Sequence, residues 1–89
     1  MKYFEHYHTR ITEKEFKKFN DLDNIWAVEQ AVNSTDGYTI VSDDLMTIPP
    51  TAYDDGGYTV EYDAYNHAYY IDVFYLISDD DDRIKELNN

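Results

Sequence analysis

Residues 58–77 read YTVEYDAYNHAYYIDVFYLI, and this stretch decides the fold. It contains two runs rich in β-branched and aromatic residues, YTVEYDA and HAYYIDVFYLI, which are separated by the short connection Tyr65-Asn66. Such runs on either side of a short connection predict two antiparallel strands that form a hairpin.

The side-chain pattern selects one register for this hairpin. If Ala64 pairs with His67, Val60 lies opposite Ile71 and one face of the hairpin becomes apolar. A three-residue loop would instead place Val60 opposite an aspartate, so the pattern favours the first register. The opposite face is then polar and carries three carboxylates: Glu61, Asp63 and Asp72. Residues 74–77 are apolar on both faces, which predicts a strand that is central or covered by a helix.

Elements before the hairpin follow from shorter signals. The aromatic-rich opening predicts a strand from about Lys2 to Thr9. Thr12, with Glu15 three residues later, forms a capping-box signature and predicts a helix start there. Helical spacing of apolar residues predicts a second helix that begins at Leu22 or Asn24 and ends near Val32.

The remaining segments complete a single domain over residues 1–89. A turn at Thr35–Gly37 leads into a short predicted strand at 38–41. Residues 42–57 contain Pro49-Pro50 and Gly56-Gly57, so we expect an acidic loop without regular structure. A short helix is expected after Ser78, where acids precede bases. The expected fold class is α+β, with about four antiparallel strands, a C-terminal hairpin and one or two helices in the first half.

Charge is the most informative feature of the composition. Seven Lys and Arg residues face nineteen Asp and Glu residues, which gives a formal net charge of −12. No Lys or Arg occurs from Phe19 to Asp82, a segment that contains fifteen carboxylates. A chain this acidic is repelled by nucleic acids and anionic membranes, so a basic protein surface is the expected partner. The open alternative is a merely solubilising acidic surface, or adaptation to high salt.

Several functional classes are disfavoured. With 89 residues, the chain offers room for one modest core and little room for a substrate cleft. It has no cysteine, no Gly-rich phosphate loop and no nucleophile elbow, so we expect no enzyme, no catalytic residue and no cofactor. Without cysteine, a secretory signal or an apolar run of about 18 residues, the chain is expected in the cytoplasm.

Metal binding receives weak support. The run Asp79–Asp82 lacks the spacing of a calcium loop, and consecutive carboxylates cannot all converge on one ion. His6 and His8 lie at strand spacing on one face and could chelate a transition metal with a third ligand. Two histidines near an N-terminus are more often structural, so no metal site is expected.

The candidate binding residues are therefore acids and amphipathic aromatics that are expected at the surface. Acids on the hairpin face, in the loop and in the tail are Asp43, Asp44, Asp54, Asp55, Glu61, Asp63, Asp72, Asp79, Asp80, Asp81 and Asp82. Tyr53, Tyr65 and Tyr70 are expected as supporting contacts, because tyrosine is enriched at binding surfaces.

In size, charge and tyrosine-rich acidic composition, the chain resembles the small DNA-mimic inhibitors of phages and mobile elements. It is also similar to bacterial immunity proteins that neutralise nuclease toxins. The resemblance covers the whole chain but involves no motif, so no family residue transfers to it. It implies an inhibitor that occupies the basic nucleic-acid-binding site of a nuclease, restriction enzyme or CRISPR effector.

Two rival functions remain open at this stage. One is a small adaptor or structural protein that binds through its apolar hairpin surface, including self-association as a homodimer. The other is an acidic metal-binding module for Ca²⁺ or Mg²⁺.

Overall fold

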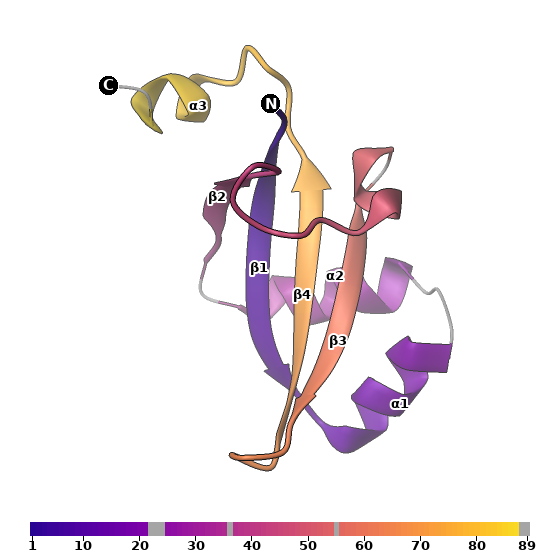
Figure 1. The fold of residues 1–89 in the computed structure, drawn as a ribbon. Coiled ribbons are helices and arrows are strands. Elements are labelled where there is room, and N and C mark those ends of the chain that lie inside the picture. The colour runs from indigo at the N-terminus through magenta and orange to yellow at the C-terminus, as the bar shows by residue number, and fades with distance from the viewer. Residues whose placement is uncertain (22–24, 36, 55, 88–89) are drawn as a thin grey trace.

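The computed structural model describes residues 1–21, 25–35, 37–54 and 56–87. Its elements run in the order β1 (Tyr3–Ile11), α1 (Glu13–Asp21), α2 (Ile25–Asn33), β2 (Thr39–Ser42), the 3₁₀ helix η1 (Pro50–Tyr53), β3 (Gly57–Asp63), β4 (Ala68–Leu76) and α3 (Asp82–Leu87). The four strands form one antiparallel sheet in the order β2-β1-β4-β3 (Figure 1). The predicted α+β class and four-stranded antiparallel sheet are confirmed.

The predicted hairpin register is also confirmed. Val60 pairs with Ile71, and Asp63 pairs with Ala68 at the turn. Strand β4 lies between β1 and β3, as the apolar character of its end predicted. Other boundaries differ slightly from the prediction, because β1 extends to Ile11 and β2 spans 39–42. The predicted starts of the second helix, Leu22 and Asn24, lie outside the described residues.

Helix α1 begins at the predicted capping box. The backbone N–H of Glu15 donates to Oγ1 of Thr12 at 3.1 Å, and the backbone N–H of Thr12 donates to Oε1 of Glu15 at 3.1 Å. These reciprocal bonds satisfy amide groups that a helix start otherwise leaves unpaired. Phe16 and Phe19 then point from α1 toward the sheet, where Phe19 is buried.

Helices α1 and α2 cover one face of the sheet (Figure 1). The core between these layers is formed by buried residues from both helices and from the two central strands: Ile11, Phe19, Val28, Ile71 and Val73. Because side chains alternate along a strand, this face takes the odd-numbered residues of β1 and β4. Most of the apolar face of the hairpin is consequently packed against the helices, whereas Tyr62 near the turn stays exposed.

A second, smaller core lies on the opposite face of the sheet. The chain between β2 and β3 crosses over one end of this face and packs Ile48 and Ala52 against Phe4 and Phe74 (Figure 1). The expectation of a loop without regular structure was wrong for residues 50–53, where the Pro-initiated turn η1 forms. The crossing chain covers the end of this face near β2 and η1, and it does not extend over the part toward the hairpin turn (Figure 1).

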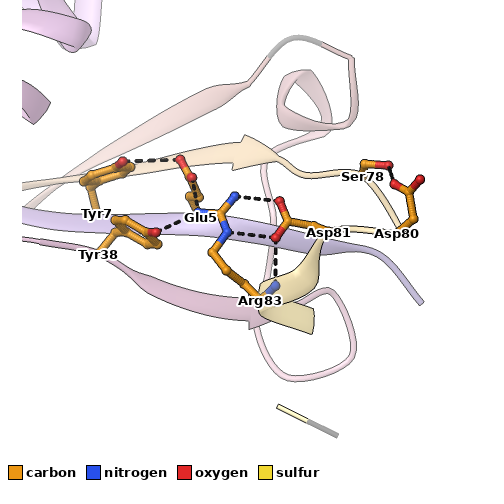
Figure 2. A network of polar contacts seen from close by, with 7 residues as sticks. All are labelled: Glu5, Tyr7, Tyr38, Ser78, Asp80, Asp81 and Arg83. Carbon is orange, nitrogen blue, oxygen red and sulfur yellow. Dashed lines mark hydrogen bonds and ion pairs between the residues drawn. The ribbon is translucent and has the colours of Figure 1, made fainter. Parts of the chain in front are cut away.

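Helix α3 is held to the sheet by the side chain of Arg83. Its guanidinium donates Nε and Nη2 to the two carboxylate oxygens of Asp81, each at 2.9 Å, and Nη1 to the hydroxyl of Tyr38 at 2.7 Å (Figure 2). The same guanidinium pairs with Glu5 of β1.

Among the described residues, no helix is long and apolar enough to cross a bilayer.

Candidate functional site

The uncovered part of the second sheet face gathers polar side chains from three strands. Alternation along the strands places the even-numbered residues of β1 and β4 and the odd-numbered residues of β3 on this side. We call this surface the open face, and it comprises His6, His8, Arg10, Thr59, Glu61, Asp63, Tyr70 and Asp72. The prediction that Glu61, Asp63 and Asp72 share one face is confirmed.

Asp72 lies at the centre of the open face and binds two histidines. Its Oδ1 is 2.7 Å from Nε2 of His6 and 2.8 Å from Nδ1 of His8. Both imidazoles belong to β1, and Asp72 pairs directly with His8 across the β1–β4 ladder. The side chain of Asp72 is 16% exposed, so this carboxylate is largely engaged inside the protein.

Glu61 stands on β3 beside this group and stays exposed. A shallow open depression of about 540 Å³ lies in front of it, lined by His8, Glu61, Tyr62, Asp63, Ala64 and Tyr70. The side chains of His8, Glu61 and Asp72 bring one ligand atom each to within 4.8 Å of one another. These three residues are a donor set that could hold a cation.

Asp63 closes the hairpin turn. Its carboxylate accepts hydrogen bonds from the backbone N–H groups of Tyr65 at 3.0 Å and Asn66 at 3.2 Å, and from the side-chain amide of Asn66 at 2.7 Å. The bonds from Asn66 hold the pKa of the Asp63 carboxyl below its ordinary value. The Asp63 carboxylate is therefore ionised, but its oxygens are occupied by hydrogen bonds within the turn. Tyr65 projects from the same turn with 91% of its surface exposed.

A second acidic surface forms at the opposite end of the sheet. Strands β2 and β4 end there and β1 and β3 begin there, so the segments that follow or precede them meet at that end. We call this surface the acidic end, and its described members are Asp43, Asp44, Asp54, Asp79, Asp80, Asp81 and Asp82. The predicted residue Asp55 lies outside the described residues.

Four described members of the acidic end have partners, and two of them, Asp43 and Asp81, are also partly buried. At the surface, Asp80 accepts a hydrogen bond from Oγ of Ser78, and Asp82 pairs with Lys85. Asp43 accepts a hydrogen bond from the backbone N–H of Lys2 at 3.0 Å and one from the hydroxyl of Tyr53 at 3.4 Å. Hydrogen bonds from the side chain and backbone of Arg83 lower the pKa of Asp81 to about 2. The other five members are exposed: Asp44, Asp54, Asp79, Asp80 and Asp82.

The predicted binding residues therefore fall into two groups. Glu61, Asp63, Asp72, Tyr65 and Tyr70 belong to the hairpin, and the remaining described ones lie at or beside the acidic end. The hairpin face and the loop, which are both expected to bind the partner, do not form one continuous surface, because the loop folds over the end of the sheet near η1.

The predicted tyrosines differ in how accessible they are. Tyr53 is half-buried, with its ring edge against Phe4, and Tyr70 is half-buried, with its ring stacked on His8. Only Tyr65 is the freely exposed aromatic that the sequence led us to expect.

Sequence reasoning missed that two histidines engage Asp72 on the open face by hydrogen bonds. The spacing of His6 and His8 predicted that they share a strand face, but Asp72 follows them by 64 residues or more, and nothing local links the two strands. It also missed Arg10, which pairs with Tyr70 across the ladder and brings a cation to the open face.

Apolar surface is exposed elsewhere than on the hairpin. A depression of about 580 Å³ beside the edge strand β2 is lined by Met1, Tyr3, Ile40, Val41, Ser42, Asp44, Leu45, Met46 and Leu87. Leu45 is 84% exposed there.

No known family, curated protein or solved structure was found that matches this chain.

Proposed function

We propose that the protein is a non-enzymatic inhibitor that binds the basic nucleic-acid-binding site of a target protein, where its acidic end stands in for phosphates. The observation that carries this proposal is that three separate segments place exposed carboxylates at the same end of the sheet: Asp44, Asp54, Asp79, Asp80 and Asp82. A cleft lined by Lys and Arg recognises such an array by the same electrostatics that it uses for a polyphosphate.

The charges near the acidic end support this assignment. The described basic side chains at this end are Lys2, Arg83 and Lys85; the Lys2 ammonium lies 5.3 Å from the centroid of the Tyr53 ring, and Arg83 is already held by Asp81 and Glu5. Lys85 lies 3.7 Å from Asp82, an exposed pair that contributes little. The resulting negative potential speeds the encounter with a positive surface and makes affinity fall with salt.

The open face contributes less charge than the sequence led us to expect. Glu61 is exposed and available to a partner, whereas Asp63 caps the turn and Asp72 binds two histidines. Reversing the charge of Asp63 or Asp72 would therefore disturb the fold, and the informative substitutions are at the acidic end.

An inhibitor that competes with nucleic acid must reach intracellular enzymes, so this function requires the protein to be in the cytoplasm.

The experiment is competition for basic targets. Purified nucleic-acid-binding enzymes, including a restriction endonuclease, a CRISPR effector and a nuclease, are each mixed with fluorescently labelled DNA or RNA, and displacement by this protein is followed by anisotropy. We expect displacement from at least one target, with an affinity that falls linearly with the logarithm of salt concentration. Asn at all five exposed acidic-end positions should weaken displacement by at least about tenfold, because each charge at the rim of an interface is worth a few tenths of a kcal/mol or more.

A matched variant controls for net charge. Glu13→Gln with Glu29→Gln removes two exposed carboxylates on the helix-covered side and should leave displacement nearly unchanged, whereas the two-site acidic-end variant Asp44→Asn with Asp79→Asn, which removes the same charge, should weaken it. Equal loss in this variant would show that only total charge matters. Displacement that is insensitive to both salt and the five Asn substitutions would overturn the proposal.

Partner binding through apolar surface is a second candidate, favoured by the depression beside β2. Most of the apolar face of the hairpin is packed against α1 and α2, so this candidate moves to Leu45, Met46 and Leu87. It predicts self-association or adaptor binding that resists salt and is lost on Leu45→Ser.

A further inference from the structure

The open face holds two histidines and two carboxylates that approach one another from three strands. His6 and His8 lie two residues apart on β1, so their rings leave the sheet on the same side. Asp72 pairs with His8 across β1–β4 and with Thr59 across β4–β3. Glu61 follows Thr59 by two residues on β3, which places it diagonally from Asp72 on that side.

The rings are held in fixed orientations before any ligand arrives. His6 stacks on Phe74 with 4.7 Å between ring centroids and an interplanar angle of 6°, and His8 stacks on Tyr70 at 4.9 Å and 16°. Oδ1 of Asp72 then receives both imidazoles, at 2.7 Å from Nε2 of His6 and 2.8 Å from Nδ1 of His8. Two ring nitrogens from the same side of one strand point at a single carboxylate oxygen, and together they form a prearranged donor set.

We propose that His8, Glu61 and Asp72 form a binding site for a divalent late transition-metal ion such as Zn²⁺. This inference goes beyond the proposed inhibitor function and does not depend on it. Their ligand atoms already lie within 4.8 Å of one another. Around a tetrahedral ion with bonds of about 2.0–2.2 Å, ligand atoms are roughly 3.3–3.5 Å apart, so the set must close by an ångström or so.

Glu61 can supply that closure. Its side chain is exposed, and it faces the open depression rather than a packed neighbour. Nδ1 of His8 and Oδ1 of Asp72 are 2.8 Å apart, so these two atoms must separate by about half an ångström for the ion to replace the hydrogen between them. His8 would then carry its hydrogen on Nε2 instead of Nδ1.

The donor atoms determine the class of ion. Ca²⁺ and Mg²⁺ prefer oxygen ligands alone, whereas one imidazole with two carboxylates suits Zn²⁺ and its neighbours in the first transition row. Three protein ligands on an exposed surface leave a coordination position open to water or to a side chain of another molecule.

His6 has a positioning role. Its ring is the most buried part of the group, with 14% of its side chain exposed, and its Nε2–H donates to Asp72. A hydrogen bond of this kind fixes the direction of a ligating carboxylate and strengthens its metal bond. The site was not expected from the sequence, because the third and fourth members lie on strands that only the folded sheet brings to β1.

The experiment is titration of the whole chain with ZnCl₂ by calorimetry in a buffer without chelator, with CaCl₂ and MgCl₂ as separate titrants. We expect one Zn²⁺ per chain and no saturable Ca²⁺ or Mg²⁺ binding. His8→Gln, Glu61→Gln and Asp72→Asn should each weaken Zn²⁺ binding by at least about tenfold, and His6→Gln should weaken it by about 10–100-fold with unchanged stoichiometry. The matched controls His67→Asn, on the same hairpin, and Glu29→Gln should bind Zn²⁺ like the parent chain.

A second measurement does not depend on whether the variants fold. Nitrogen NMR of the histidine rings in the unaltered chain should show Zn²⁺ shifting Nδ1 of His8, with little change at His67. The proposal is overturned if the parent chain does not bind Zn²⁺, if His67 is the ring that shifts, or if Glu61→Gln and folded His8→Gln bind as tightly as the parent. In the last case the His–Asp contacts are ordinary hydrogen bonds of the sheet.

Discussion

Gly57 is the position where a single methyl group should lift η1 from the sheet. This buried residue opens β3 and pairs with Phe74 underneath η1. A Cβ at this position would lie 2.3 Å from Oγ1 of Thr51, 3.0 Å from the backbone N of Ala52 and 3.4 Å from its Cα. The first contact is impossible without movement, and the second presses on the backbone of η1 itself.

The size of the effect follows from those contacts. Overpacking of this kind costs about 1–3 kcal/mol. Replacing glycine also restricts the unfolded chain, which returns about 0.4–1 kcal/mol. We therefore expect Gly57→Ala to lower the free energy of unfolding by about 0.5–2 kcal/mol, since the second core that η1 completes with Phe4 and Phe74 must loosen.

Urea unfolding followed by tyrosine and tryptophan fluorescence measures this loss. Thr51→Ala removes the nearest atom, Oγ1, and should by itself be neutral to within about 0.5 kcal/mol because Thr51 is exposed. In the Thr51→Ala background, Gly57→Ala should cost clearly less than it does alone, and the difference is the coupling energy of the pair. If Gly57→Ala is as stable as the parent chain, or if its cost is the same in both backgrounds, the packing of η1 described above is wrong.

Two further changes test local features. Thr12→Ala removes the side-chain oxygen that accepts the Glu15 N–H, so it should lower the free energy of unfolding in urea by about 1 kcal/mol, whereas Thr12→Ser should retain most of it. Arg83 lowers the pKa of Asp81 from 3.8 to about 2, so the stability that this carboxylate contributes is complete above the unfolded value and is lost as pH falls toward 2. Asp81→Asn should remove that part of the acid-induced loss, and identical pH profiles for both chains would contradict the Arg83 contact.

The hairpin and the capping box could be predicted from sequence because their signals are local. Val60 and Ile71 are separated by one tight turn, and only one register puts both on an apolar face. The Thr12–Glu15 box spans three residues and acts through its own backbone. In both cases, side-chain pattern and chain geometry allow a single solution.

The arrangement of charges could not be predicted in the same way. Whether Asp72 is a free charge depends on which strand lies beside β4, and its partner His6 is 66 residues away in sequence. Arg83 reaches Glu5 over a separation of 78 residues. A count of carboxylates therefore overestimates the charge open to a partner, because partners from remote strands are decided by topology.

The position of β1 inside the sheet has a consequence for how the domain folds. Its longest pairing is with β4, which lies at residues 68–76, so the two strands can pair only after a large loop of chain has closed. Closure of the sheet by such distant segments is slow compared with local pairing. Until it happens, the edges of β1 and β4 are open to strands of another chain, so misassembly should compete with folding at high protein concentration.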